Sequence, residues 1–190
     1  MLRPKGEFQT MKTSTLLLLT LFAASSFFAG CTGVPEGLRP VTDFESERYL
    51  GKWYEIARLD HRFERNLSNV SAFYYKNEDR SIGVVNRGYN EKSGQWEEIQ
   101  GKAAFIENES VGSLKVSFFG PFYGGYHILA LDRQAYRYAM VAGPSRSYLW
   151  ILAREKELDQ AVLAELVATA ARWGFDTQEL IYVTHNRPDA

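Results

Sequence analysis

Short strand-like runs separated by turn residues fill the middle of this chain. The runs are rich in Val, Ile, Tyr, Phe and Trp, and the segments between them contain Gly, Asn, Asp and Ser. Runs of this kind at regular spacing, with no helical pattern between them, predict sequential antiparallel hairpins in a sandwich or a closed barrel. We identify eight such runs, at residues 53–60, 70–76, 82–89, 95–106, 112–119, 125–132, 136–142 and 148–154.

The periodicity changes after the last of these runs. Apolar residues from Leu158 to Trp173 recur at a spacing of three to four, which is typical of one face of an amphipathic helix. Gly174 is suited to end this helix in the left-handed conformation, and a short final strand is expected at residues 180–184. The expected fold is all-β: an eight-stranded up-and-down antiparallel β-barrel with one C-terminal amphipathic α-helix packed outside. Such a barrel either fills itself with side chains or holds one small ligand, and the spacing leaves both open.

The start of the chain has the layout of a secretory signal. A positive charge at Lys12 precedes a short apolar run that ends in Phe28-Ala29-Gly30-Cys31, and this run is too short for a transmembrane helix. The small residues before Cys31, the only cysteine of the chain, resemble the lipobox of bacterial lipoproteins. That resemblance implies that Cys31 becomes the first residue of the mature protein and carries acyl chains, whereas the alternative is an ordinary cleaved signal beside a cysteine. Thr32 is not the aspartate that retains such lipoproteins in the inner membrane, so the resemblance implies the outer membrane.

Three segments are expected along the chain. Residues 1–30 form the signal, with Met11 as an alternative start; residues 31–42 form the acylated cysteine and a tether rich in Gly and Pro; residues 43–190 form one barrel domain. The formal net charge of -1, without a block of Lys or Arg, gives no reason to expect nucleic acid. The sequence has no Cys/His spacing typical of a metal site, and we expect neither a metal nor a cofactor.

Three sequence blocks identify a family for the barrel. Gly51-Lys52-Trp53 lies at the first strand, Asp132 begins the turn before the seventh, and Arg154 ends the eighth. In this order they resemble the three conserved blocks of the lipocalins. Residues 59–65 and 115–126 further resemble the bacterial outer-membrane lipocalins, which are relatives of apolipoprotein D. The resemblance implies a lipocalin calyx in which Trp53 closes the floor and Arg154 stacks across it, so Gly51, Trp53 and Arg154 are assigned to the fold.

Strand alternation, set against the lipocalin pattern, predicts which side chains face the barrel interior. Their surface is mostly apolar with a few hydroxyl and amide groups, as small-molecule pockets usually are, although the same side chains could simply fill the barrel. A slip of one residue in any strand would exchange its two faces. The predicted inner face consists of Ser71, Phe73, Val84, Asn86, Ile99, Val116, Phe118, Tyr126, Ala139, Val141, Tyr148 and Trp150.

Two loops are expected at the open end of the barrel. Residues 119–125 place aromatic side chains on a glycine-rich loop that could act as a lid, touch a membrane or contact a second subunit in a homodimer. Tyr123 is the expected rim contact. The other loop carries Arg62 and Arg65, whose guanidinium groups are suited to bind the phosphate or carboxylate of a lipid headgroup, although a solvated surface loop would look the same.

The lipocalin resemblance implies a carrier that binds fatty acids or lysophospholipids in its barrel, for storage or transport of envelope lipids. Cys31 would anchor this carrier to the periplasmic face of the bacterial outer membrane. One alternative is a plugged barrel that serves as a scaffold or interaction protein there. A lipid-modifying enzyme is a third interpretation, but the chain lacks the Gly-x-Ser-x-Gly and His-Glu-x-x-His motifs. Its only cysteine is at the anchor, and His127 is expected on the outer face of a strand, so we expect a binding protein and no enzyme.

Overall fold

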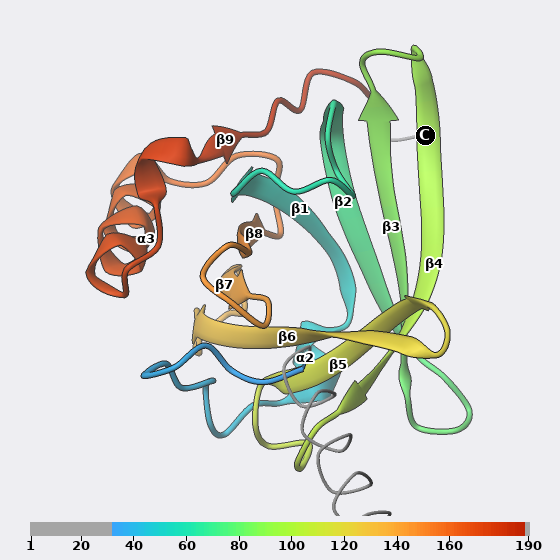
Figure 1. The fold of residues 1–190 in the computed structure, drawn as a ribbon, viewed down its shortest axis with the longest axis vertical. Helices are drawn as coiled ribbons and strands as arrows, with labels where there is room; N and C mark the ends of the chain where they lie inside the picture. The colour runs from blue at the N-terminus through green and yellow to red at the C-terminus, as the bar shows by residue number, and fades with distance from the viewer. Residues whose placement is uncertain (1–31, 189–190) are drawn as a thin grey trace, which may run out of the picture. The chain divides into compact units, whose positions relative to one another are not determined.

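The computed structural model describes residues 32–188, so Cys31 and the expected signal at residues 1–30 lie outside the described part. Within it the chain forms nine β-strands, two α-helices and one short 3₁₀ helix (Figure 1). In chain order the elements are α2 (Ser46–Tyr49), β1 (Gly51–Arg58), β2 (Leu67–Lys76), β3 (Ile82–Asn90), β4 (Gln95–Phe105), β5 (Ser113–Phe119), β6 (Phe122–Leu131), β7 (Tyr138–Ala142), β8 (Leu149–Ala153), α3 (Gln160–Arg172), η2 (Thr177–Glu179) and β9 (Ile181–Tyr182).

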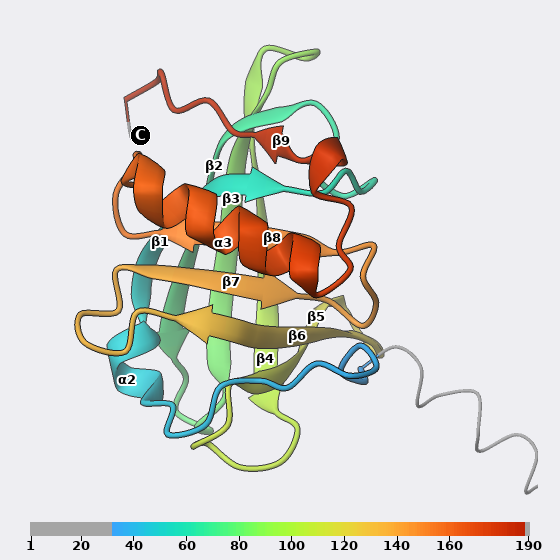
Figure 2. The ribbon, with the colours of Figure 1, turned by 90° about the vertical axis from the view of Figure 1, so that its left-hand side faces the viewer.

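The sheet closes into a barrel. Strands β1 to β8 pair antiparallel with their sequence neighbours, β1 also pairs with β8, and β9 adds to the end of β1. The predicted up-and-down barrel is therefore confirmed, with one additional strand. Because the direction alternates, the β1–β2, β3–β4, β5–β6 and β7–β8 loops share one end, which we call the mouth. The other end, which we call the floor, carries α2 and the remaining hairpin turns (Figure 2).

Two strands begin three residues earlier than the sequence predicts. These are β2, which starts at Leu67, and β6, which starts at Phe122; β1 starts two residues early, at Gly51. In β2, a β-bulge between Ser68 and Ser71 interrupts the alternation that the prediction relied on. The loop expected at residues 119–125 is correspondingly short, because only Gly120 and Pro121 separate β5 from β6.

The barrel wall separates two hydrophobic cores. The inner core contains Trp53, Tyr74 and Val84 together with other inward-facing side chains of the strands. The outer core lies between the wall and α3, where Leu166 of the helix packs in the same cluster as Met140 of β7. The helix begins after Asp159, whose Oδ1 accepts hydrogen bonds from the backbone N–H groups of Ala161 and Val162. Gly174, at φ +80°, follows the end of the helix.

The segment that precedes the first helix lies on the barrel. The carbonyl oxygen of Gly33 is 2.9 Å from Nε2 of His127 on β6. Arg146, in the β7–β8 loop, donates from Nη2 to the carbonyl oxygen of Glu36 at 2.8 Å. Val41 then enters the inner core, and its N–H donates to the carbonyl of Ile128 at 2.8 Å. Residues 33–41 are thus attached at several points along β6 and the mouth, although their composition predicts a tether.

Candidate ligand-binding site

The floor of the barrel is closed by an aromatic ring and a guanidinium group. Trp53 is fully buried and donates from Nε1 to the carbonyl oxygen of Tyr49 at 2.8 Å. The guanidinium carbon of Arg154 lies 4.0 Å from the centroid of the Trp53 ring, as the lipocalin resemblance implies. Arg154 also donates to the carbonyl oxygens of Lys52 and Arg48 at 2.8 and 2.7 Å. Gly51, at φ +92°, permits the turn beside this guanidinium group.

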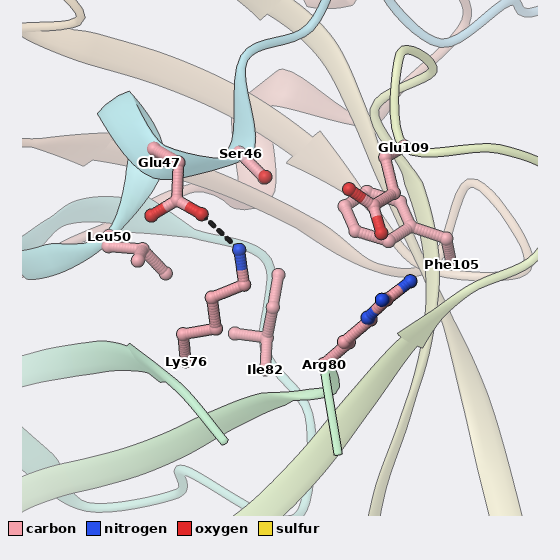
Figure 3. A pocket seen from close by; sticks show the side chains of 8 residues that line it. All are labelled: Ser46, Glu47, Leu50, Lys76, Arg80, Ile82, Phe105 and Glu109. Carbon is pink, nitrogen blue, oxygen red and sulfur yellow. Dashed lines mark hydrogen bonds and ion pairs between the residues drawn. The ribbon is translucent and has the colours of Figure 1, made fainter. Parts of the chain in front are cut away.

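A small hollow lies between α2 and the floor turns (Figure 3). Its volume is about 10 Å³, which is barely enough for one water molecule. Lys76 and Glu47 form an ion pair across it, as the dashed line in Figure 3 shows. The hollow is therefore too small for an organic ligand.

Three tyrosine hydroxyls meet inside the barrel above the floor. The Tyr49 and Tyr126 hydroxyl oxygens are 2.8 Å apart, and Tyr74 donates to the Tyr126 oxygen at 2.9 Å. Burial is the largest cause that raises the pKa of each of the three phenols. The group therefore stays neutral and supplies hydrogen bonds without charge.

Most of the predicted inner-face residues do face the interior. Asn86 lies on the same face of β3 as the buried Val84, and directly opposite Ile99 of β4. Ile99 is nevertheless 36% exposed, so solvent reaches the inner face at this level of the barrel. Tyr148 stacks on Trp150 with ring centroids 6.2 Å apart. The other predicted residues that belong to the inner core or pack against it are Val116, Phe118, Tyr126, Ala139, Val141 and Trp150.

Two predicted residues of β2, Ser71 and Phe73, lie on the outer face, so their assignment to the interior is wrong. Tyr74 pairs with the inward-facing Val84 and belongs to the inner core, which places its neighbour Phe73 outside with 48% of its surface exposed. The run Phe73-Tyr74-Tyr75 is aromatic throughout, so it contains no alternation that could identify the buried face.

Tyr123 also lies on the outer wall and not at an inner rim. The inward-facing residues of β6 are Tyr126 and Ile128, and alternation places Tyr123 on the opposite face. The ammonium nitrogen of Lys115 lies 5.1 Å from the centroid of the Tyr123 ring on this outer face. Tyr123 therefore contacts a cation and solvent.

A buried ion pair that the sequence analysis missed lies in the barrel wall near the mouth. Arg58 is 2% exposed and is opposite Trp150 in the strand register, which directs it inward. Its Nη1 donates to Oε1 of Glu55 at 2.6 Å, and its Nη2 donates to the carbonyl oxygens of Glu64 and Leu67. A β-bulge between Glu55 and Ala57 brings Glu55 and Arg58 onto one face. The sequence feature that could have identified this ion pair is the presence of two opposite charges, Glu55 and Arg58, on one predicted strand.

Glu64 in the β1–β2 loop completes this cluster. Its Oε2 accepts a hydrogen bond from Trp150 Nε1 at 3.1 Å and lies 3.0 Å from Nε2 of His61. Burial, followed by the nearby charge of Glu64, raises the pKa of Glu55. Burial acts against ionisation of Glu64 too, but hydrogen bonding to His61 and its charge outweigh it and hold the pKa of Glu64 below its usual value. These opposite directions favour a neutral Glu55 and an ionised Glu64 beside Arg58.

The two arginines predicted to bind a headgroup lie on the exposed part of the same loop. Arg65 donates from Nη2 to Oδ2 of Asp60 at 2.8 Å. The guanidinium carbon of Arg62 is 5.0 Å from the centroid of the Phe63 ring. Both are at the mouth and outside the inner core, so they could contact only the polar end of a ligand.

His127 lies on the outer face of β6, as expected. It is fully buried, with Nδ1 3.0 Å from the Ser113 hydroxyl and Nε2 2.9 Å from the Gly33 carbonyl oxygen. Both ring nitrogens are thus engaged, and a substrate cannot reach them. Residues 32–188 contain no cluster of three or more His, Cys, Asp or Glu side chains arranged to hold a metal ion. None of the helices in this part is long and apolar enough to cross a membrane.

Comparison with known proteins agrees with this geometry. A family model described as a lipocalin-like domain matches residues 44–185. The outer membrane lipoprotein Blc of Vibrio cholerae is 51% identical over 163 residues, which cover 86% of this chain and 95% of that protein. Apolipoprotein D of Macaca fascicularis is 30% identical over 155 residues, which cover 75% and 81%. Insecticyanin of the tobacco hornworm Manduca sexta has a TM-score of 0.63 at 21% identity, covering 80% of this chain and 87% of that one.

The similarity to outer membrane lipoproteins extends over most of both chains. It places this protein at the outer membrane, with a lipid anchor. The match of the family model covers the barrel, the Trp53–Arg154 floor and α3 together. The chain therefore belongs to the lipocalin family.

Proposed function

We propose that the protein is a carrier of single-chain lipids, with fatty acids or lysophospholipids as ligands, for storage or transport of envelope lipids. Family membership and the outer membrane lipoprotein relatives support a lipid-binding carrier. We further propose that acylated Cys31 holds it on the periplasmic face of the outer membrane. The closed floor and the apolar inner wall support the ligand class, because an acyl chain can enter only from the mouth and needs apolar contacts.

The exposure of Ile99 is the observation that carries this proposal. Its side chain faces the interior, and neighbouring strands contribute Val116 and Phe118 to the same wall. A barrel filled by its own side chains would bury such a residue completely. An apolar wall that solvent reaches is instead the kind of surface that an acyl chain covers favourably.

The energy available from such a wall is sufficient. Burying about 14 methylenes releases roughly 11 kcal/mol at about 0.8 kcal/mol per CH₂. Association costs at least about 4 kcal/mol, which leaves at most roughly 7 kcal/mol, or a Kd no lower than about 10 µM. No covalent step is needed for binding of this strength.

The polar end of the ligand would lie at the mouth. Arg62 and Arg65 are the headgroup candidates there, and Arg65 already pairs with Asp60. We therefore expect Arg62→Ala to weaken binding of an anionic lysophospholipid more than Arg65→Ala does. Unchanged affinity in the double variant would remove the headgroup role from this loop.

Native mass spectrometry with lipid extraction tests the proposal directly. Protein purified from bacterial membranes should carry fatty acid or lysophospholipid at close to one per chain, or one per pair of chains if it forms a homodimer. The mass of its N-terminal peptide reports acylation of Cys31. A protein that contains no co-purified lipid and does not bind added C16 or C18 lipids would favour the plugged-barrel scaffold.

We infer that the barrel binds its ligand without transforming it. The supporting observation is His127, which is buried beneath the N-terminal segment. Hydrolysis of lysophospholipid by the purified protein, abolished by His127→Ala, would contradict this inference.

A further inference from the structure

The mouth loops display the most exposed aromatic side chains in the described part of the chain. Among residues 32–188, the three most exposed large hydrophobic side chains are Phe122, Phe119 and Phe63, at 75, 67 and 63%. Phe119 and Phe122 flank the tip of the β5–β6 hairpin, and Phe63 lies in the β1–β2 loop. Both loops belong to the mouth, so the aromatic groups concentrate at the end where a ligand enters. We call these three residues the mouth aromatics.

Thr32, the first residue that the structure describes, lies near the mouth as well. The Thr32 carbonyl oxygen lies 3.2 Å from the position that a Cβ of Gly125 would take, near the start of β6. The next residue, Gly33, is held by His127, and Glu36 is held by Arg146 of the β7–β8 loop. Figure 2 shows the start of the blue segment at the same end of the barrel as the β1–β2 and β7–β8 loops.

Because Gly33 is held on the barrel, only a short length of chain separates the barrel from residue 31. Residue 31 precedes Thr32, and two residues of extended chain span at most about 7 Å. If Cys31 is acylated, as the proposed function states, its acyl chains therefore start within a few ångströms of Gly33. A leaflet that holds these chains must lie close to the mouth.

We propose that the barrel docks mouth-first on the leaflet that holds its anchor, with the mouth aromatics inserted at the membrane interface. The partner is the surface of a lipid bilayer. Protein segments that lie at a membrane interface combine Phe or Trp side chains with Lys or Arg, which anionic lipids attract, and the mouth supplies both kinds of residue. The Arg62 guanidinium carbon lies 5.0 Å from the Phe63 ring centroid, and Lys115 lies 5.1 Å from that of Tyr123. A lipid would then pass between bilayer and barrel without crossing water.

Quenching of tryptophan fluorescence by brominated acyl chains tests the docking. Acylated full-length protein is reconstituted in vesicles of phosphatidylethanolamine and phosphatidylglycerol, with and without bromolipid. Phe122→Trp places a probe at the hairpin tip, and Phe73→Trp is the matched control because Phe73 is also an exposed aromatic but lies on the outer wall of β2. After subtraction of the wild-type signal, we expect F122W to be quenched at least twofold and F73W to be unaffected. Equal quenching of both variants, or of neither, would overturn the proposal.

A second measurement separates the membrane from a second copy of the chain as the partner. Quenching of F122W by bromolipid should not depend on the number of protein molecules per vesicle. If its emission shifts to the blue only at high protein density and bromolipid does not quench it, the hairpin tip is buried against another copy and the proposal fails. The mass of the Cys31 peptide from the same sample shows whether the anchor is present, so failure of acylation is distinguished from failure of docking.

Discussion

At the scale of single residues, Glu55 and Glu64 show how two carboxyl groups in one cluster acquire different charges. Burial raises the pKa of Glu55, and the charge of Glu64 raises it further. Glu64 is buried as well, but His61, Glu55 and Trp150 all contact its carboxylate and outweigh the cost of burial. One negative charge therefore faces Arg58, whose Nε is 3.8 Å from Glu64. Pairing of Arg58 with this carboxylate lowers the cost of holding its charge inside the barrel.

The assigned charges lead to opposite expectations for two similar substitutions. Glu55→Gln replaces a neutral acid by a neutral amide and should change the free energy of unfolding at pH 7 by less than about 1 kcal/mol. Glu64→Gln leaves Arg58 without its balancing charge and should cost roughly 3 kcal/mol. Urea unfolding of the two variants and the wild type compares them under identical conditions. Equal losses in stability would contradict the assigned protonation states.

Protonation of His127 is expected to lower the stability of the fold at acidic pH. Burial lowers its pKa below the ordinary value, so the folded protein favours the neutral ring. Its contribution to stability is therefore complete above about pH 6.5 and is lost as the pH falls below that value. We expect wild-type protein to lose more unfolding free energy between pH 7.5 and pH 5 than His127→Asn, which cannot titrate. The same pH dependence in both proteins would show that His127 does not contribute.

The residues that sequence reasoning found and missed differ in a physical way. Trp53 and Arg154 were found because they occupy signature positions at the two ends of the barrel sequence. Arg58 was missed because a β-bulge beside Ala57 changes the face of the strand, and alternation cannot foresee a bulge. Phe73 was assigned to the wrong face because its neighbours are aromatic as well.

At the scale of elements, β7 and β8 show why the helix packs where it does. On β7, Ala139 and Val141 belong to the inner core, and Met140 and Ala142 to the outer one. A strand that is apolar on both faces must be covered on both, and the amphipathic stripe of α3 provides the outer cover. These long apolar patterns made the strands and α3 predictable. The four residues of α2 are too few to carry a periodic signal.

The two cores predict that stability and ligand binding respond separately. Leu166 of α3 is buried only in the outer core, so Leu166→Ala should lower the free energy of unfolding by about 2–4 kcal/mol and leave lipid affinity unchanged. Val84→Ala removes apolar surface from the inner wall and should therefore weaken lipid binding as well. Unfolding curves and displacement of a fluorescent fatty acid measure the two effects. Loss of affinity in folded L166A would show that the cores are coupled.

At the scale of the whole molecule, the barrel was predictable and its attachment to the N-terminal segment was not. Eight regular strands followed by a helix indicate the closed sheet directly. Residues 33–41, by contrast, have the glycine and proline content of a linker. Their attachment depends on hydrogen bonds from His127 and Arg146 to backbone carbonyls, which every residue possesses. Composition therefore does not reveal that this segment is attached to the barrel.

The closed floor and open mouth predict how affinity should depend on the length of a bound acyl chain. Each additional methylene buried against the inner wall contributes up to about 0.8 kcal/mol, so a C16 acid should bind at least a hundredfold more tightly than a C8 acid. Displacement of a fluorescent fatty acid measures both affinities. Phe118→Ala should reduce the affinity for C16 because Phe118 packs against the inner core, whereas Phe73→Ala, on the outer face, should not. Equal binding of C8 and C16 would mean that the acyl chain does not lie inside the barrel.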